Sequence, residues 1–421
     1  STLPFSISLH FFGAHQINLP AEPLLLLLAA LSIVWFFLHP PAPSHYLRHP
    51  ITLSGLFFLT VLLLTSFSST MPLVSFKYTF IALLHWWVFF CTLPLLFHDR
   101  PQSWLRPFTW YSIPFCLILC YAWYQHAQYN FRIDVSVLTA RPFYFDHALY
   151  SCTALLLLGP QLAGIAQRSS SRFGHLLLAV MLIIGLYFSF SRAAWLSTIA
   201  ALIGTGLLFL LKPRFWQFML MVVVGSLTLY FTTPILIQQL SKNQSPSKTE
   251  SQADHLQSAL NITSDPSNLE RINRYSCAWR MFQDRPLLGF GPGTYQFAYL
   301  PYQRAADMTH ISVTRPGPHR AGKGGGAHSE YLQALSESGA LGLSAWLAII
   351  FAFFSTTLRL IRCRIRSIQP LLLGVTFSLL TFFVHGLVNN FLHHDKIAAL
   401  FWLLLAALMH LDVHQKSAQT A

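Results

Sequence analysis

Residues 322–346, GKGGGAHSEYLQALSESGALGLSAW, place a histidine and two glutamates at the start of an apolar segment. Glycines precede the expected short helix, and Gly339 is its expected C-terminal stop. His328 then lies at or near a helix N-terminus, whose partial positive charge disfavours the imidazolium form. A neutral imidazole can act as a general base. The alternative is an interfacial histidine that only packs or forms hydrogen bonds.

A second candidate is Arg192, which lies in YFSFSRAAWLS between two apolar runs and close to Trp195. A guanidinium fixed at a membrane surface can bind phosphate through two parallel hydrogen bonds. An arginine that merely extends from the membrane to water is an equally good interpretation.

Several other patterns point away from nucleotide and metal chemistry. The glycines of GFGPG lack the Lys-Ser/Thr of a phosphate loop and follow an expected helix, so they indicate a tight structural turn. The chain has no Asp-x-Asp pair, and its 14 acidic residues are few for a site that needs several carboxylate ligands. HHDK, residues 393–396, is a possible metal-binding motif but is more simply an interfacial polar turn. The sequence therefore predicts chemistry without metal or cofactor.

The elements that position these residues are expected to be membrane helices. The 421 residues are 54% hydrophobic and 10% charged, whereas soluble domains carry about 25% charge. Apolar runs near the length needed to cross a bilayer recur along the chain. They predict spans at 22–38, 51–67, 73–97, 108–124, 148–166, 174–190, 193–211, 215–237, 340–357, 369–388 and 396–412. Residues 1–20 are a possible part of a twelfth.

Sidedness follows from the short loops, because Arg and Lys are enriched in cytoplasmic ones. RLIRCRIR, residues 359–366, is therefore cytoplasmic, and alternation places the long polar interval 238–327 outside. Residues 268–327 carry eight basic residues against three acidic ones. The outside is also the expected side for Arg132, Arg141 and Arg192. Positive charge there indicates an anionic ligand, or else a long loop that is exempt from the rule.

The outer interval divides further. Residues 241–268 are polar and Ser-rich and predict a mobile linker. Residues 269–285 predict an amphipathic helix that Pro286 stops. PGPHRAGKGGGA, residues 316–327, predicts a flexible hinge. The expected organisation is N-terminal spans in 1–237, a large periplasmic loop with a catalytic helix in 238–339, and C-terminal spans in 340–421.

Three segments together resemble the O-antigen ligase superfamily. They are SFSRAAWLS, RINRYSCAWRMFQDRPLLGFGPGTY and HSEYLQALSESGALGL. In that family an Arg-plus-Trp motif lies between spans, an Arg-led helix runs into a Pro-Leu-Leu-Gly segment, and a histidine precedes the next span. Ser329 stands where Asn is common, and Tyr275 where Trp is common. The resemblance implies an all-α polytopic membrane protein of 11–12 spans, similar to GT-C glycosyltransferases.

The resemblance also implies roles for residues. His328 matches the family's essential histidine, and Arg192 and Arg271 match its arginines. His328 is expected to deprotonate an acceptor hydroxyl while the arginines hold pyrophosphate. Glu330 and Glu337 are expected either to orient these groups or to be helix-surface charges, the latter especially for Glu337. The expected substrate contacts are Arg274, Arg285, Arg141, Arg132, Tyr275, Glu330 and Asp395.

The implied reaction transfers a polysaccharide from undecaprenyl pyrophosphate to lipid A–core at the outer face of the bacterial inner membrane. One direct displacement predicts inversion at the anomeric carbon. Family members that polymerise O-antigen or glycosylate proteins remain alternatives, as does a lipid-linked glycan flippase or other transporter. A flippase needs charges along the whole path, and here Lys77 and His85 are the main exceptions to an outer location. No pattern indicates nucleic-acid binding.

Overall fold

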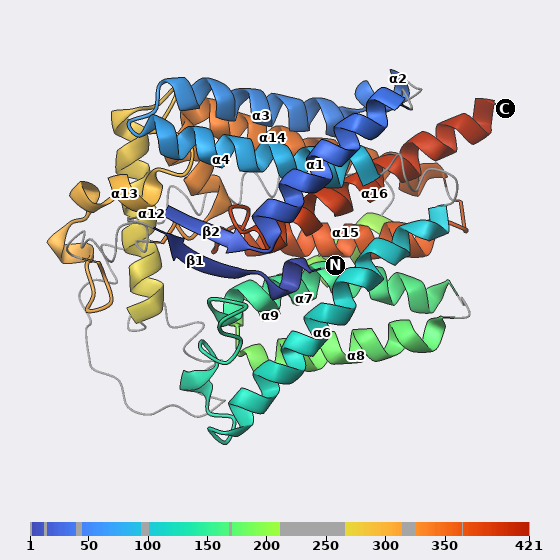
Figure 1. The fold of residues 1–421 in the computed structure, drawn as a ribbon, viewed down its shortest axis with the longest axis horizontal. Helices are drawn as coiled ribbons and strands as arrows, with labels where there is room; N and C mark the ends of the chain where they lie inside the picture. The colour runs from blue at the N-terminus through green and yellow to red at the C-terminus, as the bar shows by residue number, and fades with distance from the viewer. Residues whose placement is uncertain are drawn as a thin grey trace.

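Long apolar helices make up most of the protein, as Figure 1 shows. The computed structural model describes residues 2–11, 15–38, 44–93, 101–167, 171–210, 266–313, 325–363 and 365–420. The predicted span at 215–237, most of the predicted linker and most of the predicted hinge lie outside these residues, and the last three residues of the predicted linker belong to α12.

The bounds of the elements follow chain order. The hairpin strands are β1 (Ile7–Phe11) and β2 (His15–Leu19), and the helices before the central polar interval are α1 (Ala21–Leu38), α2 (Ser44–Leu47), α3 (Pro50–Phe67), α4 (Pro72–His85), α6 (Leu105–Ala127), α7 (His147–Ala166), α8 (Arg172–Ser189) and α9 (Arg192–Leu210). A π-helical segment, Trp86–Thr92, continues α4. The later helices are α12 (Pro266–Asp284), α13 (Tyr295–Ala298), α14 (Glu330–Cys363), α15 (Gln369–His385) and α16 (Asp395–Thr420).

Within the described residues, eight helical segments are long and apolar enough to cross a membrane. They coincide with eight of the predicted spans and make this a polytopic membrane protein of the all-α class, with β1 and β2 as the strands among the described residues. The span predicted at 369–388 is the shorter apolar helix α15. The span predicted at 108–124 lies inside α6, a 23-residue helix that is not among the eight.

The suggestion that residues 1–20 contribute to a twelfth span is wrong. Residues 7–11 and 15–19 form two antiparallel strands, in which Ile7 pairs with Leu19 and Phe11 with His15. The reason is visible in the sequence, because polar residues recur at every second position, at Ser6, Ser8 and His10. That period fits a strand with one polar face.

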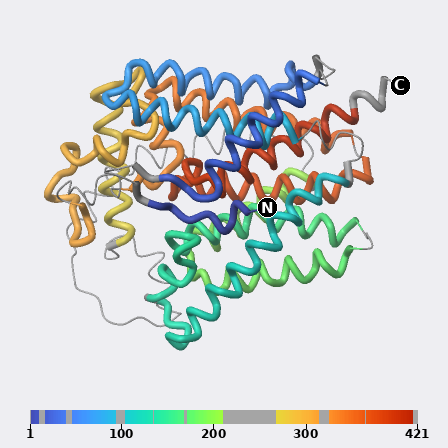
Figure 2. Tube along the Cα trace, viewed as in Figure 1, coloured from blue at the N-terminus to red at the C-terminus, as the bar shows by residue number. Residues whose placement is uncertain are grey.

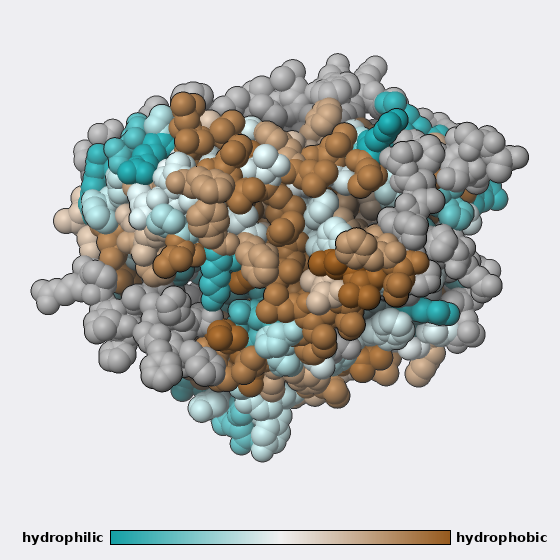
Figure 3. Space-filling view, turned by 45° about the horizontal axis from the view of Figure 1, so that its top comes forward, coloured by the Kyte–Doolittle hydropathy of each residue, from teal (hydrophilic) through white to brown (hydrophobic). Residues whose placement is uncertain are grey.

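Burial divides the helices into central and peripheral ones. In α16, 94% of the span's residues are buried, and in α7, 89% are, against 22% in α1 and 28% in α9. Backbone contact between α7 and α15 at Gly159 and Gly374 leaves no room for a side chain, as is usual where membrane helices pack closely. Figure 3 shows one face of the protein surface, where hydrophobic residues predominate and hydrophilic residues lie between them.

The two ends of the bundle differ. At one end, α12 runs across the ends of the long helices beside α13, as Figures 1 and 2 show. At the other end, Arg359 of α14 donates two hydrogen bonds, of 2.7 and 2.8 Å, to Asp412 of α16. His49 also contacts Asp412, at 3.2 Å. These contacts join α14, α16 and the start of α3 at the end where α14 finishes with Arg359 and Arg362.

Candidate active site

His328 has an unusual backbone conformation. It lies two residues before α14 with φ of 53°, in the left-handed region that a non-glycine residue rarely adopts. Its N–H donates to Asn390 Oδ1 at 3.1 Å, and its carbonyl oxygen accepts from the Tyr275 hydroxyl at 3.2 Å. A strained conformation costs about 1–3 kcal/mol and persists where the surroundings impose it, which is common at functional sites.

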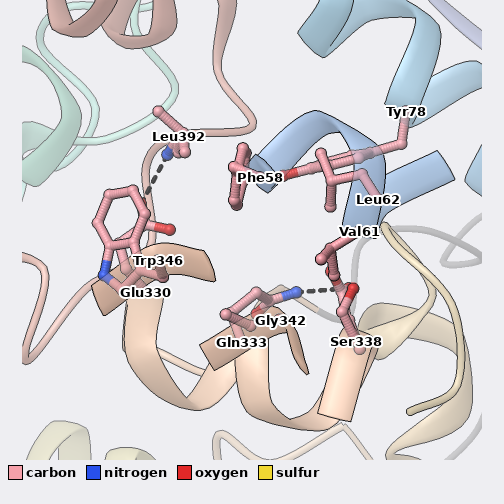
Figure 4. A pocket seen from close by; sticks show the side chains of 12 residues that line it. Phe58, Val61, Leu62, Tyr78, Glu330, Gln333, Ser338, Gly342, Trp346 and Leu392 are labelled. Atoms are coloured by element: carbon pink, nitrogen blue, oxygen red, sulfur yellow. Dashed lines mark hydrogen bonds between the residues drawn. The ribbon is translucent and has the colours of Figure 1, made fainter. Parts of the chain in front are cut away.

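The loop between α15 and α16, residues 386–394, supplies this support. Glu330 N–H donates to the Gly386 carbonyl at 2.8 Å. The Glu330 carboxylate in turn accepts from the N–H groups of Phe391, at 2.5 Å, and Leu392, at 2.7 Å; the bond to Leu392 is drawn in Figure 4. Glu330 is buried, so the helix-surface alternative is wrong for it. Its carboxylate fixes the loop that carries Asn390.

The surroundings keep the His328 ring neutral. Burial, and after it the positive charges of Arg271 and Arg274, lowers the pKa of His328 from its ordinary 6.5 to about 3. The sequence argument predicted a lowered pKa from a helix N-terminus, and the direction agrees, but burial is the larger cause. The Tyr275 hydroxyl stays protonated, because burial raises the pKa of Tyr275 to about 12.

Arg192 and Arg271 come to the same end of the bundle from different parts of the chain. Arg192 is the first residue of α9, and Arg271 lies in α12. The charges of both act on His147 at the start of α7, and the charge of Arg271 also acts on His328. Arg271 Nη1 donates to Ser267 and Asn268, each at 3.2 Å, which holds the guanidinium along α12.

Arg274 is held more firmly. It is 5% exposed, its Nε donates to Glu270 at 2.7 Å, and its guanidinium lies 4.1 Å from the centre of the Tyr299 ring. Removing one partner of such a buried pair leaves an uncompensated charge. In this structure Arg274 therefore fixes α12 and adds positive charge beside His328.

The remaining arginines expected at the site are at the surface. Arg132, Arg141 and Arg285 are all exposed. Arg141 covers the Phe145 ring at 4.8 Å, and Arg285 covers the Phe290 ring at 4.9 Å. Asp395 starts α16, where its carboxylate accepts from Asn18 at 2.7 Å.

The surface-charge interpretation of Glu337 is wrong, because this carboxylate is buried. It accepts from the Tyr295 N–H at 2.9 Å and from Gln333 at 2.6 Å. Figure 4 shows Gln333 and its neighbours facing Tyr78 and Phe58 across a cavity of about 30 Å³, which is room for about two waters. A carboxylate on an apolar helix stays buried here because the Tyr295 N–H, which follows a glycine turn, and the Gln333 side chain of the same helix donate to it.

That turn is GFGPG, as the sequence predicted. Gly289, Gly291 and Gly293 all have positive φ, and a side chain on Gly289 would meet the backbone of Glu337. Gly291 N–H donates to the Glu337 carbonyl at 2.7 Å. The turn therefore locks α12 onto α14, at the point where Gly339 interrupts the helix with φ of 63°.

Sequence reasoning missed the contribution of the 386–394 loop. Its signal was weak: Asn389 and Asn390 form an amide pair between two apolar runs, in HGLVNNFLHHDK. Gly326 fits against Asn390 so closely that a Cβ there would lie 1.9 Å from the amide nitrogen. His385, which ends α15, was missed too. It is fully buried within range of the Arg271 charge.

No cluster of three or more His, Cys, Asp and Glu side chains suited to a metal ion occurs in the described part of the chain. His393 and His394 form the turn that leads into α16, and Asp395 and Lys396 are the first two residues of that helix and are buried. The rings of His393 and His394 are in contact, with centres 4.0 Å apart and planes tilted by 38°.

Residues 177–347 match the model of the O-antigen ligase family. Over this segment the chain is similar to that family. The matched segment contains Arg192, Arg271 and His328, and it ends inside α14, before the 386–394 loop. The O-antigen ligase family includes polymerases as well as ligases. A comparison with curated proteins found no match.

Proposed function

We propose that this protein is an O-antigen ligase, which transfers a polysaccharide from undecaprenyl pyrophosphate to a sugar hydroxyl of lipid A–core. The observation that carries the proposal is His328, held neutral beside Arg271 by burial and by positive charge. A neutral imidazole is the form that removes a proton, and guanidinium groups are the natural partners of pyrophosphate.

The reaction is a single displacement. His328 accepts the proton of the acceptor hydroxyl while the oxygen attacks the anomeric carbon of the donor sugar. The bond from that carbon to the pyrophosphate oxygen breaks, and undecaprenyl pyrophosphate leaves with the electron pair. Because the nucleophile enters opposite the leaving group, the anomeric configuration inverts.

The arginines stabilise the charge that develops on the leaving group. Arg271 is held along α12 before the reaction and Arg192 starts α9 at the same end, so little reorganisation is needed when the charge appears. This role is usually filled by a divalent ion in pyrophosphate chemistry, and we propose that the arginines make such an ion unnecessary.

Donor binding also prepares the base. A histidine whose pKa is about 3 is a weak base, and part of that lowering comes from Arg271 and Arg274. An anionic pyrophosphate next to these arginines offsets their charge. The pKa of His328 then rises toward the range in which a general base is effective.

The Arg359 end carries the cluster of positive charge that is typical of cytoplasmic loops. His328 lies at the opposite end of the bundle, so we propose that the site faces the periplasmic side of the inner membrane. On this proposal residues 238–339 form the outer catalytic unit. Residues 1–237 and 340–421 form the two groups of membrane helices.

The test is transfer by purified protein in nanodiscs, with lipid-linked donor and three separate acceptors: lipid A–core, free repeat units and a pilin peptide. We expect product with lipid A–core only, unchanged by EDTA, with inverted linkage by NMR. Product with repeat units or peptide instead would assign a polymerase or a protein glycosylase. Movement of donor across the bilayer without any product would assign a flippase.

A further inference from the structure

A second, larger cavity lies among α1, α3, α4 and α16, with a volume of about 170 Å³. An engineered cavity of about 150 Å³ accepts a benzene molecule, so this one has room for one six-membered ring. It is separated from His328 by two loop residues. Asn390 binds the His328 N–H, and its amide nitrogen lies 3.5 Å from His393 Nδ1, which lines the cavity.

Buried polar atoms face this cavity. The His85 side chain is 1% exposed and places Nδ1 at 2.9 Å from the Ile81 carbonyl, so Nδ1 carries the proton. His85 Nε2 has no hydrogen-bond partner in the described part of the chain, and Asp395 Oδ1 is 3.8 Å away. Two acceptors at this separation need a donor between them, and an unpaired buried polar atom calls for an explanation.

The rest of the lining is polar at one side and aromatic at the other. Lys77 is exposed and Glu22 is half-buried, so the polar side reaches the surface. Asn18 donates to Asp395 at 2.7 Å and braces it. The buried rings of Trp402 and Phe58 line the cavity as well. A pocket of apolar walls with a few convergent polar groups is typical of a small-molecule site.

We propose that this cavity is a subsite for one sugar ring of the acceptor glycan. Sugar hydroxyls both donate and accept, so they satisfy His85 Nε2 and Asp395 as donors and Lys77 as acceptors. The carboxylates of Glu22 and Asp395 outnumber the ammonium of Lys77 in the lining, so the cavity disfavours the anionic pyrophosphate of the donor. The subsite rests on the proposed transfer reaction for its role.

The location agrees with a single displacement. The acceptor oxygen and the leaving group must lie on opposite sides of the anomeric carbon. The arginines belong to α9 and α12, whereas the cavity lies among α1, α3, α4 and α16. Figure 1 shows α9 and α4 on opposite sides of the bundle.

The experiment is steady-state kinetics of the full chain in nanodiscs, varying donor and lipid A–core separately. The variants are Asp395→Asn and His85→Gln. Asp412→Asn is the matched control, because it removes another buried carboxylate of α16 at the opposite end. We expect Asp395→Asn to raise the acceptor KM about 10- to 100-fold, the effect of losing a hydrogen bond to a charged group, and His85→Gln to raise it about 2- to 10-fold, the effect of losing a neutral one. The donor KM and kcat stay near wild type.

A second measurement separates this inference from the proposed function. Thermal shift with water-soluble, deacylated core oligosaccharide as the probe measures binding without transfer. Binding by wild type and Asp412→Asn, lost in Asp395→Asn, supports the subsite even if no transfer occurs. If both cavity variants still bind the oligosaccharide, the cavity holds only water. The same conclusion follows if the variants raise the donor KM and leave the acceptor KM unchanged. If wild type transfers glycan but does not bind the oligosaccharide, and acceptor KM is unchanged in both variants, the subsite is overturned while the function stands.

Discussion

At the scale of single residues, the ring and the backbone of His328 have separate effects. The ring serves the reaction, whereas the positive φ lowers the free energy of unfolding. We expect His328→Ala and His328→Asn both to lose transfer by about 10²–10⁴-fold. Asn tolerates the left-handed region better than Ala, so the Asn variant should be more stable by about 1 kcal/mol. Thermal unfolding of the two inactive variants measures this, and equal melting temperatures would show that the site is unstrained.

The pH dependence is also set at His328. Protonation removes the base, so activity falls as pH drops through the pKa of this histidine. In the free enzyme that pKa is about 3, which leaves the base intact at every pH above about 4. With donor bound, the anion offsets the arginines and the pKa is higher. We therefore expect the acid limb of kcat at higher pH than that of kcat/KM. Limbs that coincide would contradict coupling between donor charge and base.

The arginines differ from lysines in geometry rather than charge. If Arg192 and Arg271 hold pyrophosphate through two parallel bonds, each Lys variant should lose about 10- to 100-fold in kcat/KM for the donor. Arg280→Lys is the control, because Arg280 also lies in α12 but pairs with Asp307 at 3.4 Å. Full activity in both test variants would mean that a diffuse positive field is sufficient.

At the scale of elements, the junction between the GFGPG turn and α14 positions the short helix that follows His328. Gly339 has φ of 63°, and an added Cβ would lie 2.3 Å from the Leu287 carbonyl oxygen. We expect Gly339→Ala to lower the free energy of unfolding by at least about 3 kcal/mol. The backbone strain of a positive φ costs about 1–3 kcal/mol, and the collision with Leu287 adds to it. Gly206→Ala is the control: that glycine lies inside α9 with no neighbour within 4 Å. It should gain about 0.5–1 kcal/mol. Denaturation of both variants, followed by α-helical signal, measures the difference.

At the scale of the whole molecule, the basic Arg359 end and the α12 end should face opposite sides of the membrane. Cys363 is exposed near the first, and Gln283 is exposed near the end of α12. In cells with a permeabilised outer membrane, a membrane-impermeant maleimide should label Gln283→Cys in a background without other cysteines. In a second variant that keeps Cys363 as its single cysteine, the same reagent should label Cys363 only after the inner membrane is broken. The opposite labelling would invert the topology and exclude a periplasmic site.

The sequence alone determined the membrane class, most helix positions, the turn at GFGPG and the candidates His328, Arg192 and Arg271. It did so because apolar run length, glycine clusters and charge placed against the topological rule are local signals. Only the tertiary structure decided that Glu330 and Glu337 are buried, because their donors come from Leu392 and Tyr295, far away in the chain. It also decided that Asn390 supports His328 and that residues 7–11 pair with residues 15–19 as antiparallel strands. A side chain's burial depends on what packs against it, and no single segment of sequence contains that partner.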